Sequence, residues 1–276
     1  MRRTALLLLV PALAVNLLVF LWPMLNLAAL SFRDALPGGG IGTVLSLGTW
    51  RDLLADGYYW SLLLNSVVVS LIITLAALFC GYPIALFVHR APARWRNLLM
   101  VACIAPLLVS AVVRTYGWLV ILGDRGLLPS LLRALGWVRP PRLVFNEIGV
   151  VVALTEILMP YMILSLLAGF GRLNPVLEEA AASLGARPFT VFRRIVLPLS
   201  VPGILLGCLL AFVLAVSSFI TPSLLGGGRV PLLATEIYDQ AIVSLNWPVA
   251  AALSVIVLAV FGVALTLYGR LSRAEA

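Results

Sequence analysis

The residue types that carry covalent or metal chemistry are scarce in this chain. It contains three cysteines, Cys80, Cys103 and Cys208, each within a long apolar run, a single histidine, His89, and no lysine. Because no metal-binding spacing such as C-x-x-C joins the thiols, we expect buried, reduced cysteines and neither a metal site nor a cofactor. The absence of lysine excludes Schiff-base chemistry and the phosphate-binding lysine of a P-loop. Any ATP that drives this protein must therefore be bound by another chain.

Two charged residues lie within stretches that are otherwise apolar. Glu156 is the eighth residue of an apolar stretch that begins at Gly149, and Arg114 lies near one end of the preceding stretch. A carboxylate at that depth in a bilayer costs a few kcal/mol unless it is paired or faces water. We favour an ion pair between Glu156 and Arg114 that fixes helix packing, because antiparallel neighbouring helices can place the two at similar depth. The alternative is that Glu156 lines a solute pathway and attracts a cationic solute.

Two aromatic residues close to Arg114 also allow two interpretations. Tyr116 and Trp118 can form a wall of the pathway and make cation–π contacts to a solute. Both also lie near an expected membrane interface, where amphipathic rings anchor a span. We favour anchoring, which needs no contact with solute.

The composition indicates the environment in which this chain of 276 residues folds. Hydrophobic residues make up 62% and charged residues only 11%, and the mean hydropathy is +1.11. A soluble domain is nearer half apolar and a quarter charged, and a disordered chain is rich in charge and poor in apolar residues, so both classes are excluded. The sequence is that of a membrane protein with a net charge of +8, which predicts a lipid bilayer and no nucleic acid as its partner.

Six apolar stretches are long enough to cross a bilayer, which needs roughly 20 apolar residues per helix. The first follows Arg2 and Arg3 and is too long for a secretory signal, so we expect an uncleaved span. The stretches cover approximately residues 6–30, 61–88, 98–122, 149–167, 201–220 and 249–268. The predicted fold is an all-α membrane protein with six transmembrane helices.

The placement of arginines predicts how these spans are oriented. The connection from His89 to Arg96 is short and carries three arginines in eight residues, which favours the cytoplasmic side. The bias is modest, because the loop after the third stretch also holds several arginines. With the His89–Arg96 connection inside, six spans place both the N-terminus and the C-terminus in the cytoplasm.

The segment between the fourth and fifth stretches carries the most organised local pattern. Asn174-Pro175 predicts a helix N-cap followed by proline at the first helical position. The helix then runs through strong helix formers and is expected to stop at Gly185. Pro188 begins a second short helix, and Pro198 and Pro202 are expected to reorient the chain into the fifth span. The small apolar side chains of the first helix suit insertion into a partner's groove.

One pattern in this segment has fixed residues at three spacings. The pattern E-A-A-x3-G-x9-I-x-L-P is matched in full by Glu179, Ala180, Ala181, Gly185, Ile195, Leu197 and Pro198. It resembles the EAA loop of binding-protein-dependent ABC importer permeases. Other stretches are similar to the spermidine/putrescine-type branch of that family, and they include Ala105-Pro106, Arg114–Trp118, Met159-Pro160, Phe219–Pro222 and Asn246–Pro248.

The resemblance implies a single transmembrane permease domain over residues 1–276, with a core of approximately 61–270 and a cytoplasmic coupling loop of approximately 172–199. It also implies the type I ABC importer permease (MetI-like) architecture in a bacterial inner membrane. The chain would form half of the translocation pathway beside a second homologous permease subunit. Its other partners would be two ATP-binding subunits and a periplasmic or lipid-anchored solute-binding protein, and it would not itself be an enzyme.

The solute is less closely defined than the family. The resemblance points to polyamines such as spermidine and putrescine, while related importers handle other small solutes, including opine-like compounds and organophosphonates. The alternative function is a secondary transporter or channel that works without an ATPase and needs no coupling loop. A membrane-embedded enzyme is not supported, because the sequence shows no cluster of nucleophile, base or metal ligands.

Overall fold

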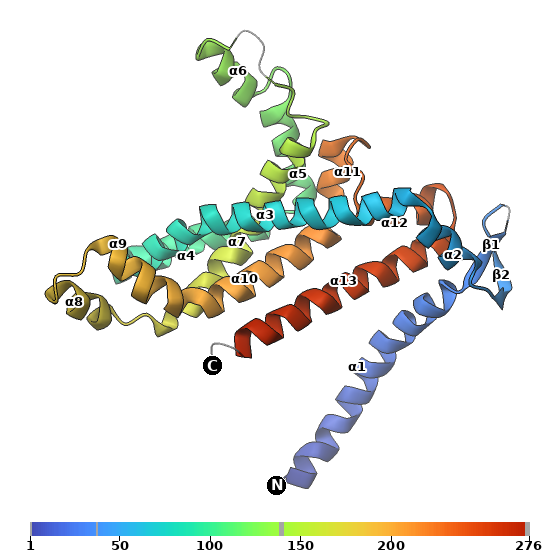
Figure 1. Ribbon diagram of the computed structural model, residues 1–276, viewed down its shortest axis with the longest axis horizontal. Coiled ribbons are helices and arrows are strands. Elements are labelled where there is room, and N and C mark those ends of the chain that lie inside the picture. The colour runs from blue at the N-terminus through green and yellow to red at the C-terminus, as the bar shows by residue number, and fades with distance from the viewer. Residues whose placement is uncertain (1, 37, 138–140, 274–276) are drawn as a thin grey trace. The chain divides into compact units, whose positions relative to one another are not determined.

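The computed structural model describes residues 2–36, 38–137 and 141–273, and it is predominantly helical (Figure 1). The longer helices are α1 (Arg2–Leu30), α3 (Gly57–Arg90), α4 (Ala93–Ile104), α5 (Ala111–Leu122), α7 (Glu147–Gly169), α10 (Leu197–Ser217) and α13 (Trp247–Arg273). The shorter ones are α2 (Gly48–Ala55), α6 (Leu127–Ala134), α8 (Pro175–Ser183), α9 (Pro188–Val191), α11 (Ile220–Gly226) and α12 (Leu233–Tyr238). Two 3₁₀ turns, η1 (Ala105–Leu108) and η2 (Phe170–Arg172), and two π-helical turns, η3 (Phe192–Val196) and η4 (Asp239–Val243), complete the helical elements.

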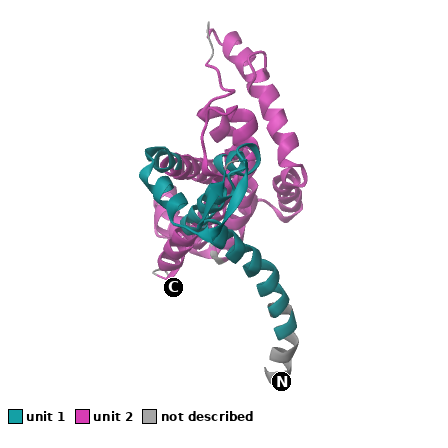
Figure 2. Cartoon of the chain, turned by 90° about the vertical axis from the view of Figure 1, so that its right-hand side faces the viewer, with its two compact units in different colours: residues 1–62, 236–260 teal, residues 63–235, 261–276 magenta. Residues whose placement is uncertain are grey.

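The chain divides into two compact units (Figure 2). Unit 1 comprises residues 1–62 and 236–260, and unit 2 comprises residues 63–235 and 261–276. Unit 1 contains a feature that the sequence did not predict, an antiparallel hairpin of β1 (Arg33–Leu36) and β2 (Gly40–Leu45). The hairpin adjoins α2, where the Thr49 hydroxyl donates a hydrogen bond of 2.8 Å to the Arg33 carbonyl.

The centre of unit 2 is the pair of helices α7 and α10, which pack along each other. Four buried small residues, Gly203, Gly207, Ala211 and Ala215, follow one another at intervals of four on α10 and so share one face. A Cβ placed on Gly169 of α7 would lie 2.5 Å from the Cα of Gly203. Small residues at such a crossing allow two backbones to approach closely. In a bilayer the hydrophobic effect does not drive helices together, so close packing of this kind is what associates them.

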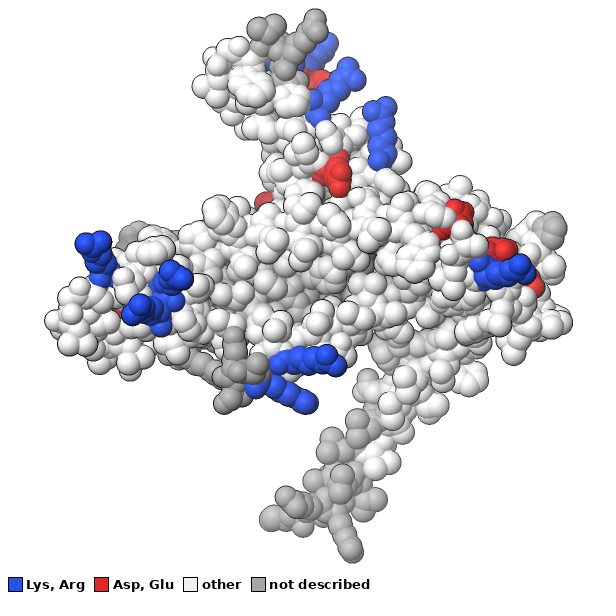
Figure 3. All heavy atoms as spheres, viewed as in Figure 1, with Lys and Arg blue, Asp and Glu red and all other residues white. Residues whose placement is uncertain are grey.

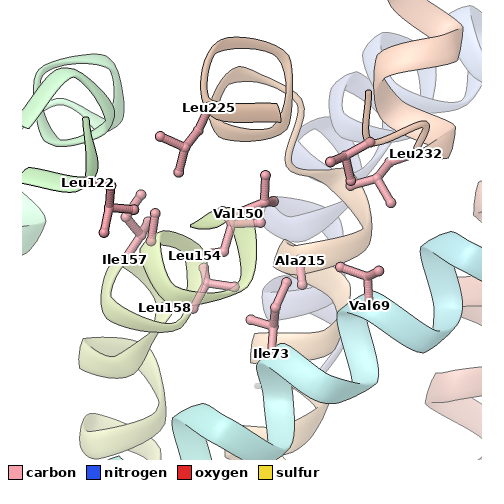
Figure 4. Packing of buried hydrophobic residues seen from close by; sticks show 12 residues of the cluster. Val69, Ile73, Leu122, Val150, Leu154, Ile157, Leu158, Ala215, Leu225 and Leu232 are labelled. Atoms are coloured by element: carbon pink, nitrogen blue, oxygen red, sulfur yellow. The ribbon is translucent and has the colours of Figure 1, made fainter. Parts of the chain in front are cut away.

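Two clusters of buried apolar side chains fill unit 2, and α7 contributes to both. The cluster nearer the start of α7 gathers Val150 and Leu154 with side chains from α3, α5, α10 and α11 (Figure 4). The second cluster surrounds Met162, Leu166 and Phe170 nearer the end of α7. The central position of α7 explains why most of its residues are buried although it is apolar enough to face lipid.

Most of the predicted spans correspond to long apolar helices. Within the described residues, four segments are long and apolar enough to cross a membrane, namely α3, α7, α13 and the continuous helical segment Pro188–Ser217. They correspond to the second, fourth, sixth and fifth predicted spans. The first predicted span lies in α1, a helix of 29 residues that contains the apolar segment Ala14–Leu30. The count of six spans and the cytoplasmic position of both termini therefore stay predictions.

The third predicted span, residues 98–122, is not one straight helix. The helical segments Ala93–Leu108 and Ala111–Ala134 meet there at an angle of 94°. Pro106 has no backbone N–H to offer, and Val109 and Ser110 are extended, with ψ of 132° and 138°. Hydropathy did not reveal the break, because the residues on both sides of it are equally apolar.

Candidate functional site

The predicted coupling loop, residues 172–199, begins as its sequence indicates. The Asn174 side chain accepts a hydrogen bond of 3.0 Å from the backbone N–H of Val176 and so caps α8. Pro175 is the first residue of α8. A backbone N–H at this position would have no partner within the helix, so proline costs no helical hydrogen bond there. Glu178 lies in the first turn, close to the positive end of the helix dipole.

Gly185 ends this first helix through a left-handed conformation, with φ of +81°. The N–H of Gly185 donates to the Ala182 carbonyl, and the N–H of Ala186 donates to the Ala181 carbonyl at 3.1 Å. These two bonds form a Schellman motif, in which glycine is favoured because it has no Cβ to oppose a positive φ. No other atom lies within 4 Å of the position of an added Cβ, so the restriction at Gly185 comes from the backbone and not from crowding.

The second arm of the coupling loop differs from the prediction. Pro188 does start α9, but α9, η3 and α10 form one continuous helical segment, so Pro198 and Pro202 do not reorient the chain. Pro198 is the second residue of α10 and so lies inside this helical segment, where its missing N–H removes one helical hydrogen bond. The π-helical turn η3 precedes it, and turns of this kind insert a residue without ending a helix.

The coupling loop presents an open, partly apolar surface. Of the residues in the E-A-A-x3-G-x9-I-x-L-P pattern, Glu179, Ala180, Gly185, Leu197 and Pro198 are exposed, and Ala181 and Ile195 are half-buried. Leu184 is 89% exposed and Phe189 is 72% exposed. Figure 3 shows arginines close to α8 and α9 on the visible face. Large apolar side chains exposed at a loop between two membrane-spanning helices are typical of a surface that binds a partner.

Two side chains near the end of α3 contact the coupling loop and residues that flank it. Arg90 forms an ion pair with Glu178 of α8, with 2.6 Å between Nη2 and Oε2. The Tyr82 hydroxyl is 2.9 Å from the Ser200 hydroxyl of α10. The ring of Tyr82 also makes edge contacts with Phe170, at the entrance of the loop, and with Phe192 in η3.

Tyr82 and Arg90 are functional candidates that sequence reasoning missed. Their partners lie 118 and 88 residues away along the chain, and no spacing in the sequence connects them. The one signal in the sequence for the Arg90–Glu178 pair was that these two opposite charges are both expected on the cytoplasmic side.

Unit 2 brings Arg114, Trp118 and Glu156 together, and we name these three residues the charge cluster. Arg114 Nη2 lies 2.6 Å from Glu156 Oε1 and also donates to the backbone carbonyl of Glu156 at 3.1 Å. The indole N–H of Trp118 donates to Glu156 Oε2 at 3.1 Å. The Arg114 side chain is 10% exposed and that of Glu156 is 37% exposed. Both carboxylate oxygens therefore have a donor within this unit.

Two other residues of α5, Tyr116 and Thr115, lie outside the charge cluster. Tyr116, which was expected to share a role with Trp118, is 55% exposed and lies outside the cluster. Thr115 is fully buried, and its hydroxyl is 2.8 Å from the hydroxyl of Thr221 on α11. Helix α5 is thus fixed to α7 by the ion pair and to α11 by the two threonines.

The cysteines show no arrangement for metal or disulfide chemistry. Cys80, Cys103 and Cys208 are all free, and the described residues contain no group of three or more histidine, cysteine, aspartate or glutamate side chains that could hold a metal ion. Cys103 and Cys208 are half-buried, but the expectation that all three are buried is wrong for Cys80, which is exposed on α3. Cys80 lies on a helix that is expected to span the membrane, where a small apolar side chain can face lipid and is stable without being buried in the protein.

Three comparisons with known proteins define the family. The family described as "Binding-protein-dependent transport system inner membrane component" matches residues 81–274. The spermidine/putrescine transport system permease protein PotB of Escherichia coli (strain K12) is 36% identical over 258 residues, which are 93% of this chain and 93% of that protein. One chain of a bacterial alginate ABC transporter, crystallised with an alginate pentasaccharide-bound periplasmic protein, has a TM-score of 0.73 at 20% identity, covering 99% of this chain and 96% of that one.

The MetNI methionine ABC transporter in an inward-facing conformation shows the same fold more distantly. Its matching chain has a TM-score of 0.58 at 15% identity, with 80% of this chain and 99% of that chain covered. The expected MetI-like architecture is thereby confirmed, and the several apolar helices fit a multi-pass protein of the bacterial inner membrane. The family match, the identity across nearly the whole chain and the shared fold together establish that this chain belongs to the binding-protein-dependent transport system inner membrane components, the permease subunits of ABC importers.

Proposed function

We propose that this chain forms half of a solute pathway and is driven by a separate ATP-binding subunit through residues 172–199. The observation that carries the proposal is the geometry of Gly185. A complete family motif ends α8 in a left-handed turn and leaves Leu184 and Phe189 exposed beside it. As a permease subunit the chain is not itself an enzyme, and its sequence has no lysine with which to build a P-loop.

The partners in this proposal follow from the same surface and from the family. A second homologous permease subunit supplies the other half of the pathway, and two ATP-binding subunits bind one coupling loop each. The exposed arginines Arg187, Arg193 and Arg194 lie in the loop and can contact acidic groups on the ATP-binding subunit. A periplasmic or lipid-anchored solute-binding protein delivers solute from the opposite side.

We propose a polyamine, spermidine or putrescine, as the solute. The support is the 36% identity to a spermidine/putrescine permease over 93% of both chains. The charge cluster adds no direct support, because Arg114 already neutralises the charge of Glu156 and each carboxylate oxygen already accepts a hydrogen bond. We therefore assign the Arg114–Glu156 pair to holding α5 against α7, and solute recognition to other residues.

Reconstitution of the complete complex in liposomes tests the proposal. The complex contains this chain, its partner permease and two ATP-binding subunits, with the solute-binding protein added outside. We expect uptake of radiolabelled spermidine that requires both ATP and the binding protein, and no uptake by this chain alone. Uptake by the purified chain without ATP would instead establish a secondary transporter or channel.

The same liposomes distinguish the solute. An excess of unlabelled putrescine should compete with labelled spermidine, whereas an opine-like compound or an organophosphonate should not. If uptake of spermidine is absent while another of these solutes stimulates ATP hydrolysis, the permease function stands and the polyamine assignment is wrong.

A further inference from the structure

Unit 2 contains a pocket of about 570 Å³ at the N-terminus of α7, the end that is remote from the coupling loop. Leu119, Val144 and Phe145 give it apolar walls, and Arg142, Arg229 and Asp124 are its charged lining residues. The walls come from the end of α5, from the segment that leads into α7 and from the segment that follows α11. None of these residues belongs to the coupling loop or to the charge cluster.

The length of α7 fixes the side of the membrane on which the pocket opens. Asn146, which lines the pocket, is the N-cap of α7, and the other end of the helix, at Gly169, leads into the coupling loop. The helix has 23 residues, which correspond to about 34 Å at 1.5 Å per residue. That length matches the hydrocarbon thickness of a bilayer, about 30 Å. If the coupling loop is cytoplasmic, as the proposed function requires, the pocket opens on the outer side.

The charge of the pocket favours an anionic group. In the part of the chain that the structure describes, the guanidinium groups of Arg142 and Arg229 have no ion-pair or hydrogen-bond partner. Asp124 contributes one opposing charge, and the N-terminus of α7 adds a partial positive charge at Asn146. Figure 3 shows arginines gathered near α6 on the visible face. Arginines outside a membrane run against the usual inward bias, so this accumulation calls for a functional reason.

The wall of the pocket is held in a costly backbone conformation. Phe145 has a φ of +58°, which is rare for a residue with a large side chain, and its N–H donates to the Leu225 carbonyl at 2.8 Å. Gly227 also has a positive φ, and a Cβ there would collide with the ring of Phe145. Strained conformations of this kind persist where surrounding structure enforces them, and they gather at functional sites.

We propose that this pocket receives an acidic side chain of the solute-loaded binding protein, with its carboxylate between Arg142 and Arg229. The proposal rests on the proposed importer function, which supplies such a partner on the outer side. A planar guanidinium binds a carboxylate through two parallel hydrogen bonds, and two of them from separate segments fix its position. The apolar walls accommodate the methylene groups of a glutamate or a neighbouring apolar side chain of the partner.

The test measures the affinity of the binding protein for the complete complex in nanodiscs. The probe is the solute-binding protein that co-purifies with the complex, loaded with spermidine. We expect Arg142→Ala and Arg229→Ala each to weaken binding by about fivefold, as the loss of a charge pair of about 1 kcal/mol does. Arg125→Ala is the matched control, because Arg125 is an exposed arginine nearby in the chain that does not line the pocket. It should change the affinity less than twofold.

Ionic strength gives a second measurement. Salt should weaken binding of the solute-binding protein to the unchanged complex, because it screens the attraction between the two arginines and the carboxylate. It should have less effect on the double variant Arg142→Ala/Arg229→Ala, in which that attraction is absent. Co-purification of the ATP-binding subunits shows that each variant is assembled. Equal losses in all three single variants would overturn the proposal in favour of a diffuse surface charge. A loss that appears only in nanodiscs with anionic lipid would overturn it in favour of a lipid headgroup.

Failure of this proposal can be told from failure of the proposed function. If the binding protein stimulates uptake by the unchanged complex but binds the pocket variants normally, only the pocket assignment is wrong. If no binding protein stimulates the unchanged complex at all, the importer function itself is wrong.

Discussion

Gly185 is the residue in the coupling loop whose identity is most tightly constrained. Its φ of +81° excludes most side chains, and its surroundings leave open space where a Cβ would lie. Asparagine and aspartate enter the left-handed region more readily than other residues, and they have the same shape. Substituting each of them for Gly185 therefore distinguishes two possible requirements at this position, a left-handed backbone and an uncharged surface.

We expect Gly185→Asp to leave membrane insertion intact and to lower solute-stimulated ATP hydrolysis and uptake by about tenfold or more, which corresponds to about 1.4 kcal/mol of lost coupling. Gly185→Asn should keep most of the uptake, because it differs from the aspartate variant only in charge. Both rates are measured in the reconstituted complex. Equal loss in the two variants would show that backbone strain, and not charge, matters here, and normal rates in Gly185→Asp would contradict the coupling role.

A second residue-scale prediction concerns Glu156. Glu156→Gln leaves the 10% exposed guanidinium of Arg114 without its counter-charge, which costs about 1 kcal/mol because the Glu156 side chain is 37% exposed and the pair is only partly buried. We expect a lower yield of assembled complex and a KM for spermidine that changes less than twofold in the complex that remains. The double variant Arg114→Met/Glu156→Gln should recover much of the yield. A normal yield with a selective rise in KM would instead place Glu156 in the solute pathway.

At the scale of elements, α3 is the helix that connects the coupling loop to the rest of unit 2. Its Tyr82 contacts Phe170 just before the loop and Phe192 within it, and its Arg90 binds α8 through Glu178. A displacement of α8 by an ATP-binding subunit would therefore be carried to α3 as well as to α10. The ion pair is partly exposed, so its contribution is expected to lie at or below about 1 kcal/mol.

Charge exchange tests this connection. We expect Arg90→Glu to lower the number of solutes taken up per ATP hydrolysed by up to about fivefold, because two carboxylates then face each other. The exchanged pair Arg90→Glu/Glu178→Arg should restore most of the ratio. Arg94→Glu, an exposed position on α4, serves as the control for added negative charge. No recovery in the exchanged pair would mean that Arg90 acts by another route.

The α7–α10 crossing makes a prediction about stability. A Cβ on Gly203 would lie 3.0 Å from the Cα of Gly169 and 3.0 Å from the Ser165 carbonyl oxygen, and backbone atoms cannot move aside easily. We expect Gly203→Val to destabilise unit 2 by about 2 kcal/mol through overpacking. Gly262→Val on α13 is the matched control, because nothing lies within 4 Å of its added Cβ. The thermal midpoints of the purified variants in detergent measure the difference, and equal midpoints would contradict the close packing.

Features set by local chemistry could be predicted from the sequence, and features set by distant contacts could not. The Asn174 cap, the turn at Gly185 and the start at Pro188 each depend on residues within a few positions. The Arg114–Glu156 ion pair was predictable because an uncompensated charge in a membrane is too costly. The part of Trp118 in the charge cluster and the contacts of Tyr82 depend on how the helices pack, which apolar periodicity does not determine.

For the whole molecule, orientation in the membrane is the property that every functional proposal here requires. The coupling loop and the pocket lie at opposite ends of α7, so one must be cytoplasmic and the other external. The connection that holds Ala93 carries the arginines that favour the cytoplasm, and Ala134 of α6 lies on the pocket side in our topology. Both residues are exposed.

Cysteine labelling tests this topology in a background where Cys80, Cys103 and Cys208 are replaced by alanine. A membrane-impermeant maleimide applied to intact spheroplasts should label Ala134→Cys and should label Ala93→Cys only after the membrane is opened. The two substitutions are the same in size, so the difference in labelling reports the side alone. The reverse pattern would invert the orientation and exclude both the coupling loop and the pocket from their proposed roles.

The contact between Gly169 and Gly203 has a mechanical consequence. At this contact the two backbones meet with no side chain between them, which holds the helices at a short separation, and one turn along α10 the Met162 side chain of α7 packs against Gly207. We expect Gly203, the point of closest approach, to act as a pivot for the segment Pro188–Ser217, with fifteen residues on the side of the coupling loop and fourteen on the other. Arms of nearly equal length turn a push at the coupling loop into an opposite movement of similar size at the outer end. One rigid helix can in this way narrow one mouth of the pathway while it widens the other.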